Sequence, residues 1–249
     1  MLSIKELDKL DGRSAREKHG VMVIEGQKVI DEAIKAGLVV QQLLATRRAL
    51  GAYGAWITPL RAKLQITDIA DHSAQRLANT ATPSGLFAVV ELPKPNWENF
   101  LTLPKLVAID GVKDPGNLGT MLRTASWFGV KGVLLSRTGV DPYNSKVIRA
   151  TMGSLFHQQL WVTDDLSDEL TQLKEAGFQI IVTRPEGKPA PVEPAAKWCV
   201  VMGNESVGTS AEVDELADTT FTIPSFGKDT ESLNVSVSFG IALHELTRV

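Results

Sequence analysis

The sequence predicts an α/β protein, and three observations lead to that prediction. Short apolar runs typical of strands alternate with longer segments whose apolar residues recur at helical spacing. Glycines stand directly after several of the helical segments, where a left-handed residue commonly ends a helix. Strand and helix patterns alternate throughout residues 105–249. Such alternation is typical of a parallel sheet with helices on both faces.

Residues 1–92 are expected to form a smaller α/β unit, because they contain strand and helix patterns and are numerous enough to fold independently. Residues 93–104 are rich in proline and show no clear period, which predicts a linker. The expected elements of the first unit are a short helix or arm over 1–19, strands over 21–24, 39–45 and 84–90, helices over 27–36, 47–52 and 69–77, and a strand fragment at 56–57.

The second half is expected to form one domain over residues 105–249. Its final helix carries so many apolar residues that we expect it to be buried in the core or at a subunit contact. The expected strands cover 105–109, 132–135, 155–162, 179–182, 199–202 and 219–223, and the expected helices cover 118–128, 145–152, 166–176 and 233–246.

The composition is that of an ordinary soluble globular protein, with 43% hydrophobic and 22% charged residues among 249. No apolar run reaches the roughly 18 to 20 residues that span a bilayer, and the N-terminus lacks an apolar signal core. We therefore expect a cytoplasmic protein with no membrane partner. The net charge of −3 argues weakly against nucleic acid, so any RNA contact would use local basic groups. The candidates are Arg13, Arg16, Lys18, Arg47, Arg48, Arg61 and Arg76.

Three polar loops follow predicted strand ends or precede a predicted helix. One begins at Asp114, one contains Gly203-Asn204-Glu205, and one lies between Pro224 and the final helix. In open α/β sheets, ligands bind outside the carboxyl ends of strands, so these loops could form a pocket. Spacing alone favours simpler roles, because Asn117, Ser232 and Asn234 are common helix-capping types and an arginine on a polar helix face is usually solvated.

Several kinds of site are not supported by the sequence. Neither a G-x-G-x-x-G fingerprint, nor a Walker-type loop, nor a G-x-S-x-G elbow occurs, and the four histidines do not have metal-ligand spacing. The single cysteine, Cys199, lies in an apolar run, which indicates a buried residue rather than a nucleophile. A site made from Arg, Asn, Glu and Ser around glycine turns, without a metal, suits transfer of an already activated group.

Three segments carry a resemblance to a known family. They are Asp114-Pro-Gly-Asn-Leu-Gly-Thr-Met-Leu-Arg-Thr-Ala, Met202-Gly-Asn-Glu-Ser-Val-Gly, and Ile223-Pro with Glu231-Ser-Leu-Asn-Val-Ser-Val-Ser. In this order they resemble the motifs of the SpoU/TrmH-type RNA ribose 2′-O-methyltransferases of the SPOUT superfamily. More loosely, residues 1–92, with Val23-Ile-Glu-Gly-Gln, resemble that family's N-terminal RNA-binding domain, which has a ribosomal-protein L30e-like α/β fold.

The resemblance implies S-adenosylmethionine as methyl donor, a ribose 2′-hydroxyl of RNA as acceptor, with ribosomal RNA slightly favoured over transfer RNA, and a homodimer. It also implies a deep trefoil knot in the second domain, although ordinary topology rules argue against knots. Carried over by motif, the catalytic residues are Asn117, Arg123, Glu205, Ser232 and Asn234, and the cofactor-binding residues are Thr183, Met202, Gly203, Ile223 and Leu233.

The resemblance leaves other functions open. The chain could be a non-catalytic RNA-binding or ribosome assembly factor that keeps the fold, a SPOUT enzyme that methylates a base, or an unrelated enzyme acting on a small molecule. Arg123 is proposed in the family to act as a base. An arginine is a poor base because its guanidinium stays protonated in proteins, so we expect this residue chiefly to stabilise the developing alkoxide and to bind the adjacent phosphate.

Overall fold

The structure is a computed structural model that describes residues 2–78, 80–185, 193–227, 229 and 232–248. The chain divides into two compact units. The first comprises Met1–Lys94 and Tyr143–Phe156, and the second comprises Pro95–Pro142 and His157–Val249. The segment Tyr143–Phe156 therefore packs with the first unit, although it lies between two strands of the second unit in sequence.

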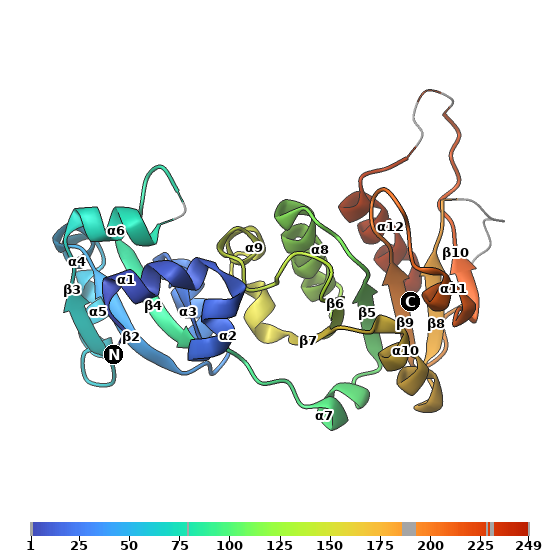
Figure 1. Ribbon diagram of the computed structural model, residues 1–249, viewed down its shortest axis with the longest axis horizontal. Coiled ribbons are helices and arrows are strands. Elements are labelled where there is room, and N and C mark those ends of the chain that lie inside the picture. Colours follow the sequence, from blue (N-terminus) through green and yellow to red (C-terminus); the bar gives the residue numbers. More distant parts are fainter. Residues whose placement is uncertain (1, 79, 186–192, 228, 230–231, 249) are drawn as a thin grey trace. The chain divides into compact units, whose positions relative to one another are not determined.

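The first unit is built on a four-stranded sheet with the order β1-β4-β2-β3 (Figure 1). Strand β4 (Leu86–Glu91) runs antiparallel to β1 (Val21–Glu25) and β2 (Val40–Ala45), and β3 (Gln65–Asp68) is parallel to β2. The prediction of β1, β2 and β4 is confirmed to within two residues at each end. Strand β3 was missed because it lies at the edge and is short and polar, so it has no strong apolar pattern.

The helices of the first unit cover this sheet and contribute to its core. Their bounds are α1 Ile4–Asp8, the 3-10 turn η1 Lys9–Asp11, α2 Arg13–His19, α3 Gln27–Lys35, α4 Arg47–Ala52, α5 Gly54–Leu60, α6 Asp71–Leu77 and α9 Ser145–Thr151. The predicted strand fragment at 56–57 is wrong, because Trp56 and Ile57 lie within α5, with Ile57 buried. Two apolar residues are too few to distinguish a strand from a helix.

The second unit contains a six-stranded sheet with the order β10-β8-β9-β5-β6-β7. Every pair of neighbouring strands is parallel, which confirms the predicted parallel α/β fold. The central strand β9 is buried along its whole length. The bounds are β5 Lys105–Ile109, β6 Gly132–Ser136, β7 Gln159–Thr163, β8 Gln179–Thr183, β9 Trp198–Met202 and β10 Thr219–Phe221.

Most predicted boundaries in this half hold, and three need correction. Helix α8 (Pro115–Trp127) begins three residues before the predicted position. The predicted strand 155–162 is divided into the 3-10 turn η2 (Ser154–His157) and the strand β7. The short helix α11 (Ala211–Glu215) was not predicted. Helix α10 covers Leu166–Glu175 and α12 covers Val235–Thr247, close to their predicted ranges.

The predicted linker 93–104 contains a structural element of the second unit. Helix α7 (Trp97–Leu101) places Phe100 in the core of the parallel sheet, where it is fully buried. Trp97 stacks on Phe100 with ring centroids 5.3 Å apart and also lies 4.7 Å from the Trp161 ring. The description of this segment as a simple linker is wrong, because these aromatic side chains bury apolar area against a strand far away in sequence.

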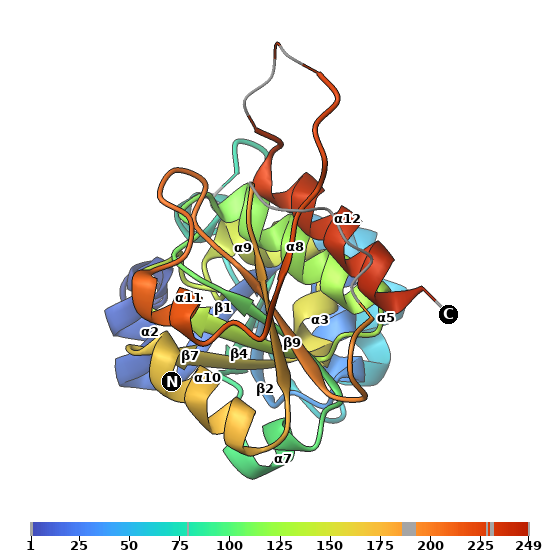
Figure 2. The ribbon, with the colours of Figure 1, turned by 90° about the vertical axis from the view of Figure 1, so that its right-hand side faces the viewer.

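Helices α8 and α12 pack side by side (Figures 1 and 2). The Phe128 and His244 rings meet edge to face at 6.3 Å at one end of the pair. Val235, Phe239, Ala242, Leu243 and Leu246 of α12 are buried, whereas Val237 is 50% exposed. The last helix is thus buried on one side only. In the described part of the chain, no helix is both long enough and apolar enough to cross a membrane.

Candidate functional site

The loops that follow β5 and β9 lie together at the carboxyl ends of these central strands. The main-chain N–H of Asp110 donates to the carbonyl oxygen of Met202 at 2.8 Å. The Asn204 side chain donates from Nδ2 to the carbonyl oxygen of Gly111, also at 2.8 Å. These bonds join the loop after β5 to the end of β9 and its loop. They fix the positions of the two loops relative to each other.

The first turn of α8 presents Asn117 toward this edge. Asp114 is the N-cap, and its Oδ1 accepts a hydrogen bond from the main-chain N–H of Asn117 at 2.7 Å. Pro115 occupies the first helical position, where its fixed φ and missing N–H are tolerated. The interpretation of Asn117 as a possible cap is therefore wrong. Because Asp114 performs the capping, the Asn117 side chain is available for other partners.

Asn117 connects the three sequence motifs. Its Nδ2 donates to Oε1 of Glu205 at 3.0 Å, and its Oδ1 accepts from Nδ2 of Asn234 at 3.0 Å. These partners stand 88 and 117 residues away in sequence. Asn234 also caps α12, because its Oδ1 accepts from the main-chain N–H of Ser236 at 2.9 Å. Asn234 therefore caps α12 through its Oδ1 atom and contacts Asn117 through its Nδ2 atom, so both roles suggested by the sequence are present.

The glycine loop after β9 has a shape that only glycine permits at its first position. A Cβ atom on Gly203 would overlap the main-chain atoms of Gly208 and Thr209. The loop closes on itself because the main chains of Asn204 and Gly208 exchange hydrogen bonds of 2.9 and 3.0 Å. The Oδ1 atom of Asn204 also accepts from the N–H of Ser206 at 2.9 Å. Asn204 therefore holds this loop both internally and against Gly111.

A second set of contacts holds the far side of the same loop. Thr209 donates from Oγ1 to Asp214 Oδ1 at 2.5 Å, and Arg184 forms an ion pair with the other oxygen of Asp214 at 2.8 Å. Sequence reasoning missed Asn204, Thr209 and Asp214 as supports of the loop. Only Asn204 had a usable signal, because an asparagine after a strand end and beside a glycine is typical of a side-chain-stabilised turn.

The predicted site residues fall into two groups. Asn117, Glu205 and Asn234 are hydrogen-bonded to one another. Arg123 and Ser232 are exposed, and the described part of the chain offers neither side chain a hydrogen-bond or ion-pair partner. The stretch before Ser232 includes Lys228, Thr230 and Glu231 of the third motif, which lie outside the described residues.

The predicted cofactor-binding residues lie at strand ends and in adjoining loops. Thr183 ends β8, and its hydroxyl donates to the carbonyl of Val201 at 2.9 Å. Met202, the last residue of β9, is buried, while Gly203 and Ile223 are half-buried. Leu233 is 47% exposed. In the part of the chain that the structure describes, the main-chain N–H groups of Gly203, Ile223 and Leu233 donate to no other residue.

Two other kinds of chemistry find no support among the described residues. They contain no group of three or more His, Cys, Asp or Glu side chains placed to hold a metal ion. Burial raises the pKa of the Cys199 thiol far above its usual range. A thiol in this environment is a poor nucleophile, because the thiolate is the reactive form.

Two family models match the chain, one in each half of the sequence. The family model described as the SpoU rRNA methylase family matches residues 104–244, which is more than half of the chain. The chain belongs to the SpoU rRNA methylase family. A second model, described as the MRM3-like substrate binding domain, matches residues 2–88. The SpoU match therefore covers the parallel sheet and the linked residues Asn117, Glu205 and Asn234.

Members of known function and known structure align over almost the whole chain. The 23S rRNA (guanosine(2553)-2′-O)-methyltransferase RlmP of Bacillus subtilis is 31% identical over 245 residues, which cover 98% of this chain and 95% of RlmP. The structure of the SpoU methyltransferase AviRb from Streptomyces viridochromogenes in complex with AdoMet has a TM-score of 0.85 at 25% identity, covering 98% and 96% of the two chains. An RNA 2′-O ribose methyltransferase structure has a TM-score of 0.78 at 30% identity, covering 97% and 93%.

Proposed function

We propose that this protein transfers a methyl group from S-adenosylmethionine to a ribose 2′-hydroxyl of RNA, with ribosomal RNA as the substrate class. The observation that carries the proposal is the link through which Asn117 holds both Glu205 and Asn234. Family membership supports the reaction type, the name of RlmP supports a ribosomal 2′-hydroxyl, and the AdoMet complex of AviRb supports the methyl donor. A cytoplasmic location, expected from the sequence, belongs to the same proposal.

The residues at the strand ends fit a nucleoside cofactor. Gly203, Ile223 and Leu233 have main-chain N–H groups without a partner among the described residues, and Ile223 and Leu233 add apolar side chains beside them. Adenine needs donors and acceptors along its edge and apolar contact on its faces, so this combination suits it. Thr183 and Met202 would complete the wall next to Gly203. Bound there, S-adenosylmethionine supplies a methyl group already activated by its sulfonium charge.

Arg123 would act on the RNA. Its guanidinium is exposed and makes no hydrogen bond or ion pair within the described residues, so it is available to a substrate. A guanidinium remains protonated, and its donors can stabilise the negative charge that develops on the 2′-oxygen as the hydroxyl passes its proton to solvent water. Asn117, Glu205 and Asn234 would then fix the first turn of α8 and the glycine loop relative to each other. Ser232 would contribute a hydroxyl at the start of α12.

A homodimer and a trefoil knot belong to the same proposal. Trp127 of α8 is 86% exposed, and Val237 and Leu233 are 50% and 47% exposed. Large exposed apolar side chains on α8, on α12 and just before α12 favour coverage by another protein surface, and a second copy of the chain would supply it. The knot is proposed because the chain belongs to the SpoU rRNA methylase family. The first unit, which the MRM3-like substrate binding domain matches, would bind RNA through an L30e-like fold.

The reaction can be tested with the whole protein and labelled cofactor. S-adenosylmethionine carrying a tritiated methyl group is incubated with bulk ribosomal RNA and, separately, with bulk transfer RNA, and each RNA is then hydrolysed in alkali. We expect label from ribosomal RNA in alkali-resistant dinucleotides, because a methylated 2′-oxygen cannot cleave the adjacent phosphodiester. Label in a modified base would show a base-methylating enzyme, and RNA binding without any transfer would indicate an assembly factor.

Gly203→Ala tests the proposed cofactor site. The added methyl group has no room beside the main chain of Gly208 and Thr209, so the loop must move. We expect S-adenosylmethionine to bind roughly 100-fold more weakly or worse, a loss typical of a misplaced binding loop, as measured by isothermal titration calorimetry. Gly51→Ala in α4 is the matched control, because a Cβ at that position meets open space and the residue belongs to the first unit. Equal affinities of the Gly203→Ala and wild-type proteins would contradict the assignment of this loop.

A further inference from the structure

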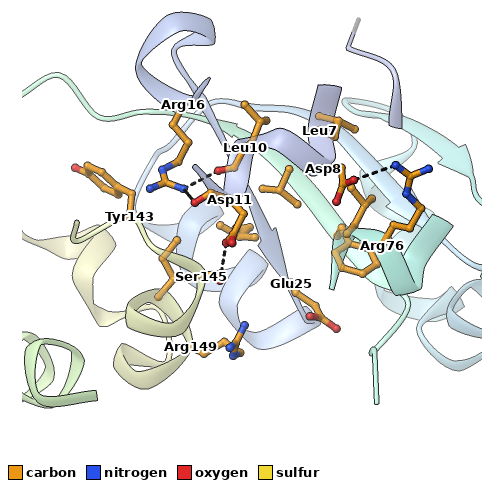
Figure 3. A pocket seen from close by; sticks show the side chains of 15 residues that line it. Leu7, Asp8, Leu10, Asp11, Arg16, Glu25, Arg76, Tyr143, Ser145 and Arg149 are labelled. Carbon is orange, nitrogen blue, oxygen red and sulfur yellow. Dashed lines mark hydrogen bonds and ion pairs between the residues drawn. The ribbon is translucent and has the colours of Figure 1, made fainter. Parts of the chain in front are cut away.

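A cavity of about 170 Å³ lies inside the first unit (Figure 3). Its walls come from the N-terminal helices, the sheet strands β1 and β4, helix α6 and helix α9. Apolar side chains form much of the lining, namely those of Leu7, Leu10, Leu77, Phe87 and Ile148. Three arginines and three carboxylates are set among them.

Most of these charged groups are already held by the protein. Arg76 pairs with Asp8 at 3.0 Å, and Asp11 accepts a hydrogen bond from the Ser145 hydroxyl at 3.1 Å (Figure 3). Arg16 is buried and donates to the carbonyl oxygens of Leu10 and Asp11 at 2.6 Å. These contacts tie α9 and the N-terminal helices together and build the cavity wall, so they have structural roles.

Arg149 and Glu25 differ from the other charged groups. Arg149 is half-buried and lines the cavity, and its guanidinium has no hydrogen-bond or ion-pair partner in the described part of the chain. Glu25 accepts one hydrogen bond, from the main-chain N–H of Ser84 to Oε1 at 2.7 Å, and within that same part its second carboxylate oxygen accepts none. The cavity therefore keeps one strong donor group and one strong acceptor group for a ligand.

We propose that this cavity binds a guanine base of single-stranded RNA, an inference that rests on RNA being the substrate. The Arg149 guanidinium would donate to O6 and N7 of the base, a bidentate pairing for which its fork geometry is suited. The Glu25 carboxylate would accept from N1–H and the exocyclic amino group on the adjoining edge. Val23 and Leu77, the apolar lining residues that keep the most accessible surface, would contact the ring, as apolar side chains do around unstacked bases.

A base fits this lining better than a phosphate group does. An anion at Arg149 would also meet the carboxylate of Glu25, and like charges in a partly buried site repel. A neutral ring with donors on one edge and acceptors on the next satisfies both side chains at once. Adenine lacks this pattern, because its N1 is an acceptor that would face Glu25.

Binding of labelled oligonucleotides to the full-length protein tests the inference. Fluorescein-labelled octamers of uridine, without or with one central guanine or one central adenine, are titrated at one fixed salt concentration and followed by fluorescence anisotropy. We expect the guanine octamer to bind roughly tenfold tighter than the other two, in keeping with one well-made bidentate contact. Equal affinity of the wild-type protein for all three octamers overturns the proposal.

Three variants separate base recognition from charge. Arg149→Lys keeps the charge and loses the fork, so the guanine preference should disappear while binding of the all-uridine octamer stays unchanged. Glu25→Gln keeps the acceptor for Ser84 but places an amide donor against the base, with the same expected loss. Arg61→Gln removes an exposed arginine of the same unit that does not line the cavity, and the preference should remain.

Two further results would count against the inference. If Arg149→Lys and Glu25→Gln, with melting curves like that of the wild type, kept the preference, another site would be reading guanine. If Arg149→Gln weakened all three octamers equally, the arginine would contact phosphate. Methyl transfer to ribosomal RNA by a protein without guanine preference would remove this inference alone, whereas absence of transfer would remove the proposed function.

Discussion

Helices α8 and α10 both lie after a parallel strand of the second unit, and both begin at an aspartate. Asp114 accepts a hydrogen bond from the N–H of Asn117 at 2.7 Å. Asp165 accepts from the N–H groups of Ser167 and Asp168 at 3.0 and 3.2 Å. Each aspartate satisfies donors that a helix N-terminus leaves unpaired. Their caps alone do not distinguish the two helices.

The remaining polar residues of the first turns show the difference. In α10, the Ser167 hydroxyl donates back to Asp165 at 2.7 Å, and Glu169 accepts from the Trp161 indole only eight residues away. In α8, Asn117 bonds to residues 88 and 117 positions away. Polar groups with local partners stabilise their own helix, whereas Asn117 fixes the relative positions of three loops. The two helices therefore differ in what their first turns hold, because the polar groups of α10 serve one turn and one neighbouring strand, whereas Asn117 joins three sequence motifs.

The largest expected difference between the two helices is in kcat, when Arg123 of α8 or Lys174 of α10 is replaced by alanine. Arg123→Ala in α8 should lower kcat by about 10²-fold to 10³-fold or more, because it removes donors that stabilise developing charge, while S-adenosylmethionine affinity changes little. Lys174→Ala in α10 should leave kcat unchanged, because Lys174 pairs with Asp218 and the carbonyl of Leu216. Single-turnover methyl transfer and calorimetry measure the two quantities. Undiminished turnover by the Arg123→Ala protein would refute the role given to this residue.

A change at Asn117 should have the next largest effect. Asn117→Asp keeps the size of the side chain but loses the donor to Glu205 and places two carboxylates side by side. We expect kcat to fall roughly 10-fold to 100-fold, as happens when catalytic loops are misplaced by a small distance. Ser167→Ala in α10 is the control, since its hydroxyl serves only Asp165. Similar turnover by both variants would show that the link between motifs has no function.

The comparison also shows how much of the fold the sequence could predict. Segments with their own pattern were found closely, such as α4 (Arg47–Ala52) and β5 (Lys105–Ile109). Elements whose stability comes from distant contacts were missed. Helix α7 lies in a proline-rich segment without a clear helical pattern. Its stability depends on the burial of Phe100 in the core and on the contact between the Trp97 and Trp161 rings. Local propensity does not contain those contacts.

For the candidate site, the sequence indicated which residues to consider but not how they are joined. The motifs named Asn117, Glu205 and Asn234, yet spacing could not separate caps from site residues, because asparagine serves both roles. No sequence pattern identified Thr209 and Asp214, which hold the glycine loop. Their hydrogen bond joins that loop to α11 and so depends on the folded structure. The grouping of Tyr143–Phe156 with the first unit likewise depends on tertiary packing.

Replacing the capping aspartates, Asp114 and Asp165, should lower stability in both cases but reduce turnover only for Asp114. The expected loss of turnover is smaller than for the changes at Arg123 and Asn117. Asp114→Ala should lower the free energy of unfolding by about 1 kcal/mol, the usual loss for a helix cap. It should also reduce turnover several-fold, because Asn117 then loses the fixed position of its main chain. Asp165→Ala should lower the melting temperature and leave turnover unchanged below it. Equal loss of turnover in both variants would remove the distinction between the two helices.

The smallest expected effect concerns pH and Asp165. Hydrogen bonds from the Ser167 hydroxyl and then from the main-chain N–H groups of Asp168 and Ser167 lower the pKa of the Asp165 carboxyl. A carboxylate with a lowered folded-state pKa contributes stability above its unfolded pKa, about 3.9, and loses it as the pH falls through the folded-state pKa. Asp165→Asn keeps an acceptor that does not titrate. The melting temperature of the wild type should therefore fall more steeply than that of the variant between about pH 5 and pH 2. Parallel curves would show that the charge of Asp165 adds nothing to the cap, while its hydrogen bonds would still hold the first turn of α10.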